Sequence, residues 1–442
     1  MRRHILIVLG LILLLVIAAV AALAWPDKAQ VPFEQVTGPR PQLTAPRTQT
    51  IPTVKIAEVV GWRNGAMPTP AAGLKVQPFA TGLDHPRWLY RLPNGDVLVA
   101  ESNSPPRPKT GITDWVMGLL MKRAGAGVPS ANRITLLRDA DGDGAAELRQ
   151  VFMSGLNSPF GMTLFKGHLY IGNTDALVRV PYTDGQTRIT AKPELVVKLN
   201  PAGNHWTRNV IAAPDGRTLF VSVGSASNIG EKGMEREKYR ANILQVWPED
   251  KNWRIYSAGL RNPNGMAINP ATKQLWTVVN ERDMLGSDIV PDYLTQVTFG
   301  DQFGWPWYYW GGYPDRRVEP RNPELQQYSR RPDYALGPHV AALGLAFSDD
   351  VRLGGRFASG AFIGEHGSWN RKPVSGYRVS HVRFGANGFP AAGAKPIDVL
   401  TGFLDREGRA QGRPVGVIGD KSGAMLVADD VGNVIWRVSP GR

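Results

Sequence analysis

The chain has no cysteine among its 442 residues. Disulfide bridges, thiolate zinc sites, iron–sulfur clusters and cysteine nucleophiles are therefore excluded. Histidine is also scarce, with seven in the whole chain, so a histidine in a polar loop is a candidate for acid–base chemistry.

Charged residues form no basic block, although the net charge is +13 from 51 basic and 38 acidic residues. An excess of positive charge favours an anionic partner, such as acidic lipid headgroups, a polycarboxylate ligand or nucleic acid. Because the charges are spread along the chain, nucleic acid is the least favoured of the three, and no nucleic-acid partner is expected.

The N-terminus carries a long apolar run, 21 residues from Ile5 to Trp25 without a charge. A helix of this length spans roughly 30 Å, enough to cross a bilayer. Residues 1–25 are therefore expected to be a membrane anchor, or a signal peptide cleaved after residues 22–24; the length of the run favours the anchor. Arg2 and Arg3 predict a cytoplasmic N-terminus, which places the body at the periplasmic face of the cytoplasmic membrane, or in the periplasm after cleavage.

Residues 26–73 are rich in proline and poor in apolar periodicity. This composition predicts a semi-extended linker, with one short strand suggested at 53–60. The folded body is expected over residues 74–442. Its glycine, proline and tryptophan contents suit many short strands joined by tight turns.

One pattern recurs six times in the body: a turn with Gly, Asn or Asp, then a short β-rich run that ends near a polar residue. It occupies residues 92–102, 165–175, 213–225, 269–281, 357–368 and 420–430. Such units at spacings of roughly 50–90 residues are typical of propeller blades lengthened by loop insertions. We therefore expect an all-β, six-bladed β-propeller, because a β-sandwich of about 100 residues fits this length poorly.

Two insertions interrupt the pattern. Residues 112–127 have apolar residues at helical spacing, which predicts a helix packed on the propeller rim; a helix resting on a membrane surface is the minor alternative. Residues 304–317 form a dense aromatic loop, which either paves a blade or lines a sugar-binding opening.

Asp139, Asp141 and Asp143 alternate as they do at the start of a calcium-binding loop. The twelfth position holds Gln150 where an acid is expected, and Glu147 is a partial substitute. A calcium site and a solvated turn are equally compatible with this pattern.

His205 stands in a polar loop directly ahead of a predicted strand. Propellers expose such loops around the central channel, and imidazole is the natural general base near neutral pH. A histidine that only bonds to a backbone group is an equal alternative.

Four further segments place arginine at a turn beside a predicted strand, each in a different blade. Their candidate residues are Arg87; Arg261 and Asn262; His366, Trp369, Asn370 and Arg371; and Arg413. Converging guanidinium groups would form an anion site, because they bind carboxylates bidentately. A rim ion pair worth about 0–1 kcal/mol is the alternative for any one of them, but four such segments favour convergence.

These segments carry a resemblance to a known family. The motifs are NHWTRN (204–209), GLRNPNGMA (259–267), NERDMLGSD and PDYLT (280–295), FGWPW (303–307), HGSWNRKPVSGYRV (366–379), and GRPVGV with VADD (412–430). Together they resemble the pyrroloquinoline-quinone (PQQ)-dependent sugar dehydrogenases, and within that family the L-sorbosone and fungal pyranose dehydrogenases more than the soluble glucose dehydrogenases. The resemblance covers residues 74–438 and implies a six-bladed propeller with the quinone in a central cleft.

The resemblance also implies roles for individual residues. His205 is implied as the general base that takes the proton of the substrate hydroxyl while hydride moves to the quinone. The implied cofactor contacts are Arg87, Arg261, Asn262, His366, Trp369, Arg371 and Arg413. PQQ carries three carboxylates, so several arginines and a positive net charge suit it.

Two departures from the glucose enzymes bear on the chemistry. The acidic residue that orients their base is replaced here by Ser225, and their calcium motif appears as Arg282-Asp283. A calcium ion, expected as a Lewis acid on the quinone, would then be bound by Glu281, Asp283 or Asp288, or be absent.

The expected function is therefore oxidation of a sugar, alcohol or aldehyde, sorbosone-like or aldose-like, with electrons passed to a membrane quinone or a cytochrome. The alternatives are a metal-dependent lactonase and a binding propeller without catalysis.

Overall fold

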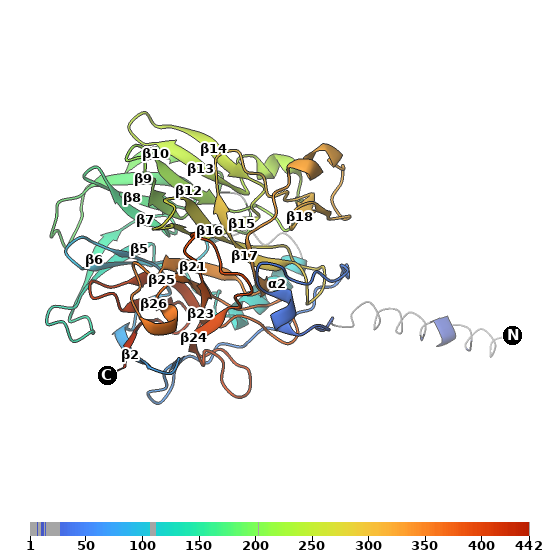
Figure 1. Ribbon diagram of the computed structural model, residues 1–442, viewed down its shortest axis with the longest axis horizontal. Helices are drawn as coiled ribbons and strands as arrows, with labels where there is room; N and C mark the ends of the chain where they lie inside the picture. Colours follow the sequence, from blue (N-terminus) through green and yellow to red (C-terminus); the bar gives the residue numbers. More distant parts are fainter. Residues whose placement is uncertain are drawn as a thin grey trace.

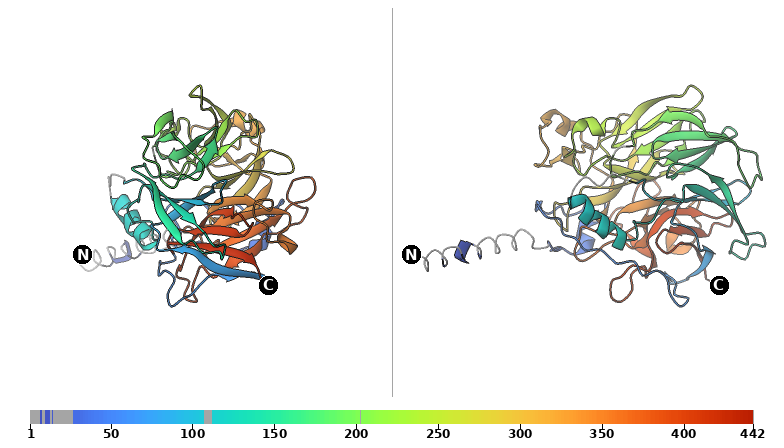
Figure 2. Two further views of the ribbon diagram at one scale, coloured as in Figure 1. Left: turned by 90° about the vertical axis from the view of Figure 1, so that its left-hand side faces the viewer. Right: turned by 180° about the vertical axis from the view of Figure 1, so that it is seen from behind.

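Each of the six repeated turns joins the first and second strands of one antiparallel sheet. The computed structural model describes residues 27–106, 112–201 and 203–441, together with positions 7, 10–12 and 14. In these residues six sheets of four or five strands follow one another around a common axis, which confirms the six-bladed propeller (Figure 1). Figure 2 shows the succession around the axis from cyan through green to red.

The first three sheets hold the following strands, from the axis outward. They are β3 (Pro86–Arg91), β4 (Val97–Glu101), β5 (Arg133–Arg138) and β6 (Leu148–Ser154); β7 (Met162–Phe165), β8 (His168–Asn173), β9 (Ala176–Pro181) and β10 (Glu194–Lys198); and β11 (Val210–Ala212), β12 (Leu219–Val223), β13 (Asn242–Trp247) and β14 (Asn252–Ala258).

The other three sheets continue the ring. They are β15 (Asn262–Ile268), β16 (Leu275–Asn280), β17 (Pro291–Val297) and β20 (Tyr334–Pro338); β21 (Ala342–Phe347), β22 (Gly360–Glu365), β23 (Arg378–Arg383), β24 (Ile397–Thr401) and β1 (Thr69–Pro70); and β25 (Pro414–Gly419), β26 (Met425–Asp429), β27 (Val434–Pro440) and β2 (Leu74–Thr81). The remaining elements are the hairpin β18 (Tyr308–Tyr309) and β19 (Tyr313–Pro314), the helix α2 (Ile112–Arg123), and the 3₁₀ helices η1 (Phe33–Val36), η2 (Met234–Glu237), η3 (Pro323–Tyr328) and η4 (Gly355–Phe357).

The ring closes because β2, the first long strand, pairs with β27, the last. Their register runs from Leu74 opposite Pro440 to Thr81 opposite Val434. The two ends of the body are thereby held in one sheet, with β2 as its outer strand.

The inner strands touch through their backbones around the axis. A Cβ on Gly344 would lie 2.2 Å from the carbonyl oxygen of Val415, and one on Gly265 would lie 2.6 Å from that of Leu343. Neighbouring blades therefore approach so closely that only glycine fits at these positions.

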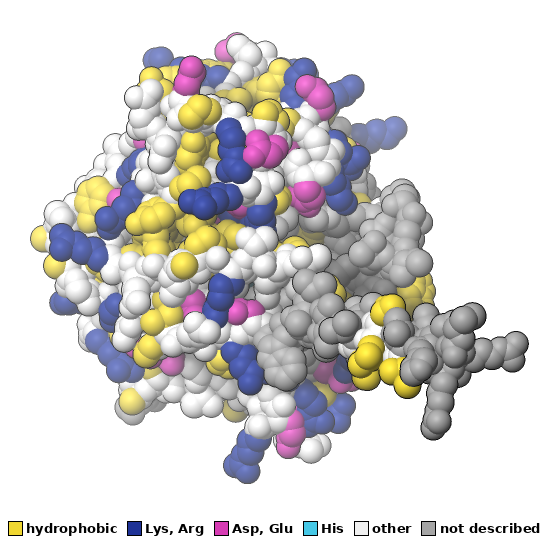
Figure 3. Space-filling model, turned by 90° about the vertical axis from the view of Figure 1, so that its right-hand side faces the viewer, with side chains coloured by type: hydrophobic (Ala, Val, Ile, Leu, Met, Phe, Trp, Pro, Cys, Tyr) yellow, Lys and Arg dark blue, Asp and Glu magenta, His cyan; other side chains and the backbone are white. Residues whose placement is uncertain are grey.

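Antiparallel order decides which loops meet. Each inner strand begins, and each second strand ends, at the same end of the propeller, so twelve strand termini converge there. The helix α2 joins the end of β4 to β5 and lies at this end as well. In Figure 3, which faces the side that carries α2, apolar side chains form a band with Lys and Arg around it.

Residues 27–73 lie along the propeller. Gly38 forms an isolated bridge with Ala335, and β1 extends the sheet of β24. The strand suggested at 53–60 is reduced to a single bridge between Val59 and Ala410. The segment is extended, as its prolines predict, but it is docked on the body.

The helix predicted over 112–127 is observed as α2, with Trp115 58% and Leu119 48% exposed. Most of the predicted N-terminal anchor falls outside the described residues. In the part of the chain that is described, no helix is long and apolar enough to cross a membrane.

The core contains one histidine far from the site. His381 of β23 is fully buried between Phe357 and Phe362, and burial lowers its pKa from 6.5 to about 4. A depressed histidine pKa stabilises the fold above the unfolded-state value and loses that contribution as the pH falls through the folded-state value.

We therefore expect the unfolding free energy to fall as the pH drops from 6.5 to about 4, with His381 contributing on the order of 3 kcal/mol. The variant His381→Phe should show a shallower pH dependence in urea titrations at neutral and acid pH. An unchanged pH slope would show that His381 is not buried in its neutral form.

Candidate active site

His205 lies in the loop that leads into β11, and the end of β12 holds it in place. Its Nδ1 lies 2.8 Å from the carbonyl oxygen of Ser225 and 3.0 Å from the Ser225 hydroxyl. Because that hydroxyl donates to the carbonyl oxygen of Ser227 at 2.7 Å, both Ser225 oxygens act as acceptors. Nδ1 therefore carries the proton, and Nε2 keeps its lone pair.

Two glycines let this loop come so close. A Cβ on Gly203 would lie 2.0 Å from the Ala226 carbonyl oxygen, and Gly203 has a φ of +86°. A Cβ on Gly224 would lie 2.7 Å from the Cβ of His205 and 2.2 Å from Oδ1 of Asn262. The second glycine thus brings the histidine beside the amide of Asn262, as the sequence motifs predict for a common site.

Two buried arginines, which the sequence analysis missed, hold the backbone of this loop. Arg208 donates to the carbonyl oxygens of His205 (2.9 Å) and Asn200 (2.9 Å). Arg240 donates to the carbonyl oxygens of Asn200, His205 (2.6 Å) and Ser225 (3.2 Å). Burial lowers the pKa of Arg208 well below its usual range, with the charge of Arg240 adding to the effect.

Arg87 and His366 meet on the carboxylate of Asp430. His366 Nε2 lies 2.8 Å from Oδ2 of Asp430, Arg87 pairs with the same oxygen, and His85 Nε2 lies 3.4 Å from it. The guanidinium of Arg87 also lies 5.5 Å from the ring of Trp206, the residue next to His205. The structure therefore connects the loop of the candidate base to two of the predicted cofactor contacts.

The charge state of this cluster follows from burial. Burial lowers the pKa of His366 and of His85 to about 4, against the opposing effect of Asp430. Burial would raise the pKa of Asp430, but the two histidines and Arg87 hold it well below its usual range. Near neutral pH the cluster consists of one carboxylate, one guanidinium and two neutral imidazoles.

Arg413 stands at the start of β25, next to this cluster, where it lowers the pKa of His366. Its Nη2 donates to the hydroxyl of Tyr377 at 2.9 Å. The backbone N–H of Arg413 donates to Asp429 at 2.7 Å, and the same carboxylate accepts from Trp62 and Trp436. The two aspartates of the VADD motif thus have separate tasks: Asp429 holds the loop, and Asp430 holds the cluster.

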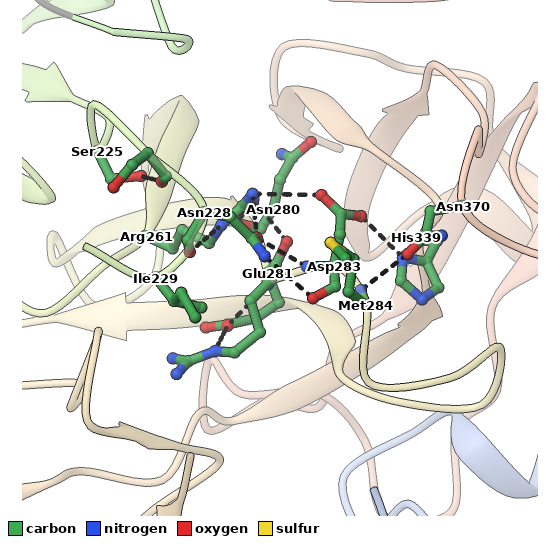
Figure 4. A network of polar contacts seen from close by, with 12 residues as sticks. Ser225, Asn228, Ile229, Arg261, Asn280, Glu281, Asp283, Met284, His339 and Asn370 are labelled. Atoms are coloured by element: carbon green, nitrogen blue, oxygen red, sulfur yellow. Dashed lines mark hydrogen bonds and ion pairs between the residues drawn. The ribbon is translucent and has the colours of Figure 1, made fainter. Parts of the chain in front are cut away.

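Arg261 occupies the centre of a different network (Figure 4). It donates to the carbonyl oxygens of Asn228 (3.1 Å), Glu281 (2.6 Å) and Asn280 (3.4 Å), to Oδ1 of Asn228 (2.9 Å), and to Asp283 (3.3 Å). Every guanidinium N–H therefore has an acceptor within the protein. Arg261 organises the loops beside His205 and leaves no donor for a cofactor.

The three predicted calcium ligands do not converge. Asp283 pairs with Arg261 and lies 3.3 Å from Nδ1 of His339, and Glu281 lies 3.1 Å from Nε of Arg282. Asp288 accepts from the backbone of Gln30 at 2.7 Å on the docked N-terminal segment. In the described residues these carboxylates do not form a group with mutual oxygen distances within 4.8 Å, so they do not fit one cation.

Both ring nitrogens of His339 face oxygen atoms. Its Nε2 faces the Gly286 carbonyl oxygen at 3.0 Å, and its Nδ1 faces Asp283. Burial would lower the pKa of His339, but Asp283 raises it above the usual value. Burial would likewise raise the pKa of Asp283, but His339 and Arg261 lower it below the usual value.

Arg371 has its contacts with the docked N-terminal segment and the loop after β16. It donates to the carbonyl oxygens of Ser287 (2.9 Å) and Pro373 (2.7 Å), and it lies 5.4 Å from the ring of Phe33 on the docked segment. Trp369 is half-buried, and its carbonyl oxygen accepts from the backbone of Lys55 at 2.9 Å. These contacts give Arg371 a structural task in the docking of the N-terminal segment.

The acidic residues of the calcium-like loop do come together. Asp139, Asp141, Asp143 and Glu147 place one oxygen each within 4.8 Å of one another. They belong to the turn between β5 and β6, which antiparallel order puts at the opposite end of the propeller from His205. The carboxylates of this turn are therefore too far away to bind a quinone, or a calcium ion beside it, at the end that carries His205.

The aromatic side chains of the loop at residues 304–317 pack against the body of the propeller. Trp305, Tyr308, Tyr309 and Trp310 are buried, and fully buried Arg282 donates to the carbonyl oxygens of Pro306 and Tyr308. Of the two interpretations of residues 304–317, packing against a blade is therefore the one observed for these four side chains.

We call the group formed by His205, Asn262, Arg87, His366 and Arg413 the axial site. Several buried polar atoms of this site and of Asp430 beside it have no hydrogen-bond partner in the described residues. They are Nε of Arg87, Nε of Arg413, Oδ1 of Asn262 and Oδ1 of Asp430. The two guanidinium N–H donors fit a ligand with carboxylates and carbonyls, which is the chemistry of PQQ, and the two oxygens are acceptors for a ligand donor or a water.

The fold and the site together define the class of this protein. It is a β-propeller in which a histidine and several arginines lie at one end of the propeller axis. The family model described as TrAA12-like matches residues 68–293 and 287–440, so the chain belongs to this family. The resemblance seen in the motifs is thereby confirmed at the level of the family.

Individual relatives agree with this assignment. The aldose sugar dehydrogenase YliI of Escherichia coli is 26% identical over 298 residues, which are 62% of this chain and 74% of that protein. The holo PQQ domain of pyranose dehydrogenase from Coprinopsis cinerea has a TM-score of 0.67 at 18% identity and covers 87% of this chain and 100% of its own. The calcium structure of a Trichoderma reesei enzyme of family AA12 has the same TM-score and identity, over 85% and 97% of the two chains. At such identities the two structures show the fold alone.

The role of Arg261 is testable by stability. Arg261→Lys leaves most of its buried acceptors without a donor, so it should lower the unfolding free energy by roughly 1–3 kcal/mol. Denaturant titration measures the change, and Arg217→Lys in an exposed turn is the matched control. Equal stability of Arg261→Lys and the parent would contradict the structural role.

Proposed function

We propose that this protein is a PQQ-dependent dehydrogenase that oxidises a sugar or a related alcohol or aldehyde. The observation that supports this best is the axial site, in which a histidine that is held through Nδ1 shares one end of the propeller with buried guanidinium groups that keep unpartnered N–H donors. Membership of the TrAA12-like family supports the same activity.

Arg87 and Arg413 would hold the carboxylates of the cofactor, and Asn262 and His366 would border it. Both arginines are already fixed, Arg87 by Asp430 and Arg413 by Tyr377, so little side-chain entropy is lost when a ligand binds. When bound, the quinone supplies a two-electron acceptor for the hydride of the substrate carbon.

His205 would remove the proton of the substrate hydroxyl at its Nε2. The Ser225 oxygens keep the proton on Nδ1, which stabilises the imidazolium that forms and keeps the ring in one orientation. Arg208 and Arg240 both donate to the carbonyl oxygen of His205 and so fix the backbone of the base. The imidazole ring therefore does not need to reorganise during the reaction.

The finer parts of the proposal rest on sequence. We propose aldoses or sorbosone-like aldehydes as substrates and a membrane quinone or a cytochrome as electron acceptor. The uncharged run of residues 5–25 supports attachment at the periplasmic face of the cytoplasmic membrane. Calcium remains an expectation from the resemblance, since Glu281, Asp283 and Asp288 do not fit one ion.

The activity is tested by mixing the purified protein with PQQ and assaying dye reduction with a panel of aldoses and aldehydes. We expect quinone-dependent dye reduction with at least one substrate. A protein that does not bind the quinone would contradict the proposal, and lactone hydrolysis without quinone would favour a hydrolase.

The base assignment predicts a separation of binding and rate. His205→Ala should bind the quinone as the parent does, while sugar oxidation falls by roughly 10²–10⁴-fold, the usual size of a general-base contribution. Quinone titration and steady-state kinetics measure the two quantities, and His168→Ala, at the start of β8, is the control. An unaltered oxidation rate in His205→Ala would refute the assignment.

Arg413→Ala should have the opposite profile. Loss of a charged donor should weaken quinone affinity by roughly 10- to 100-fold, as expected for a hydrogen bond to a charged group of about 1.5–3 kcal/mol. Exposed Arg383→Ala controls for the change in net charge. Parent-like affinity in Arg413→Ala would remove this arginine from the cofactor site.

A further inference from the structure

A buried carboxylate lies one step behind the hydrogen bonds of His205 Nδ1. Glu237, at the end of η2, is 5% exposed. Its Oε2 accepts from the backbone N–H of Ala226 at 2.6 Å, and its Oε1 accepts from the hydroxyl of Ser227. Residues 225–227 form the turn that carries the acceptors of His205.

The carboxylate fixes the direction of each donor in this turn. A carboxylate only accepts, so the Ser227 hydroxyl must donate to Glu237, and its oxygen accepts from the N–H of Gly230 at 2.9 Å. Ser225 then donates to the carbonyl oxygen of Ser227, and His205 donates from Nδ1 to Ser225. This chain of hydrogen bonds has one direction and ends at the Nδ1 proton of His205. In the neutral imidazole the lone pair is then on Nε2.

The segment that carries Glu237 also contacts the turn of residues 225–227 through a second side chain. Arg240, three residues after Glu237, donates to the carbonyl oxygens of His205 and Ser225. Glu237 thus holds N–H and O–H groups of the turn, while Arg240 holds its carbonyl groups. Ser225 and Ser227 are fully buried, so water does not compete for these bonds.

We infer that Glu237 is a positioning residue for His205, which acts through Ser227 and Ser225. The inference rests on the proposed role of His205. In Glu237→Gln the amide oxygen can still accept from the Ala226 N–H, which only donates, but the amide N–H₂ then faces the Ser227 hydroxyl and donates to it. The Ser227 hydroxyl proton loses its fixed acceptor, and the turn no longer presents its acceptors in one arrangement.

The first test needs no catalysis. The protein is labelled with ¹⁵N-histidine, and His205 is assigned by its loss in His205→Gln. In the parent we expect the ring signals of a single neutral tautomer protonated at Nδ1; in Glu237→Gln we expect a mixture of tautomers. Glu235→Gln, an exposed residue of the same 3₁₀ helix with the same charge change, should match the parent.

Identical His205 signals in the parent and in Glu237→Gln would overturn the inference. If Glu237→Gln does not fold, Ser227→Ala removes the hydroxyl that links Glu237 to the turn and should give the same mixture of tautomers. This measurement decides the inference even if the protein proves not to oxidise sugars.

The second test uses turnover of the quinone-loaded protein. Glu237→Gln should lower kcat by roughly 10- to 100-fold, the size expected for a misplaced catalytic group, with unchanged quinone affinity. In a His205→Ala background the same substitution should have no further effect on kcat, because its action passes through the imidazole. A full additional loss in that background would show that Glu237 acts by some other route.

Discussion

Donation from arginine to main-chain carbonyl oxygens is the interaction on which the axial end of this propeller depends. Where inner strands begin and second strands end, the chain leaves the β-ladders, and buried carbonyl groups need donors from elsewhere. Arg208 and Arg240 supply them to the loop of His205, Arg261 to the turn after β16, and Arg282 to the aromatic loop. A guanidinium suits this task because it has several donors in a rigid plane.

This demand divides the arginines of the molecule into two groups. Those that satisfy backbone carbonyl groups hold the loops. Among them Arg261 has an acceptor for every guanidinium N–H, whereas Arg208 keeps an unpartnered Nε among the described residues. Arg87 and Arg413 are instead fixed by one side-chain oxygen each and keep an unpartnered Nε among the described residues. The positive net charge therefore serves the architecture as well as an anionic ligand, and composition alone does not separate the two uses.

The fold could be predicted from the sequence because its signal is local. Each blade has its own turn and strand in the repeated pattern, and the ring follows from their number. The placement of His205, Arg87, His366 and Arg413 at one end of the propeller was also predicted, because their motifs stand at strand termini. The structural task of Arg261 could not be predicted, because its acceptors come from Asn228 and from a turn about twenty residues downstream.

Glu237 and Asp430 were missed for a similar reason. Glu237 lies in an insertion between β12 and β13 without strand periodicity, and its contact with the turn of Ser227 exists only in the folded chain. The calcium assignment rested on acidic residues close in sequence, but the fold directs Asp288 toward the docked N-terminal segment. That segment was predicted as a linker because extended backbone has the same composition whether it is free or docked.

The central claim is that the axial site holds a tricarboxylate quinone beside His205. A crystal structure of the protein grown with PQQ tests it most directly. The account predicts cofactor carboxylates within hydrogen-bond distance of Arg87 and Arg413, and Nε2 of His205 facing a space beside the quinone carbonyl. A cofactor bound elsewhere on the propeller, or an axial end filled by the protein's own side chains in crystals grown with saturating PQQ, would contradict it.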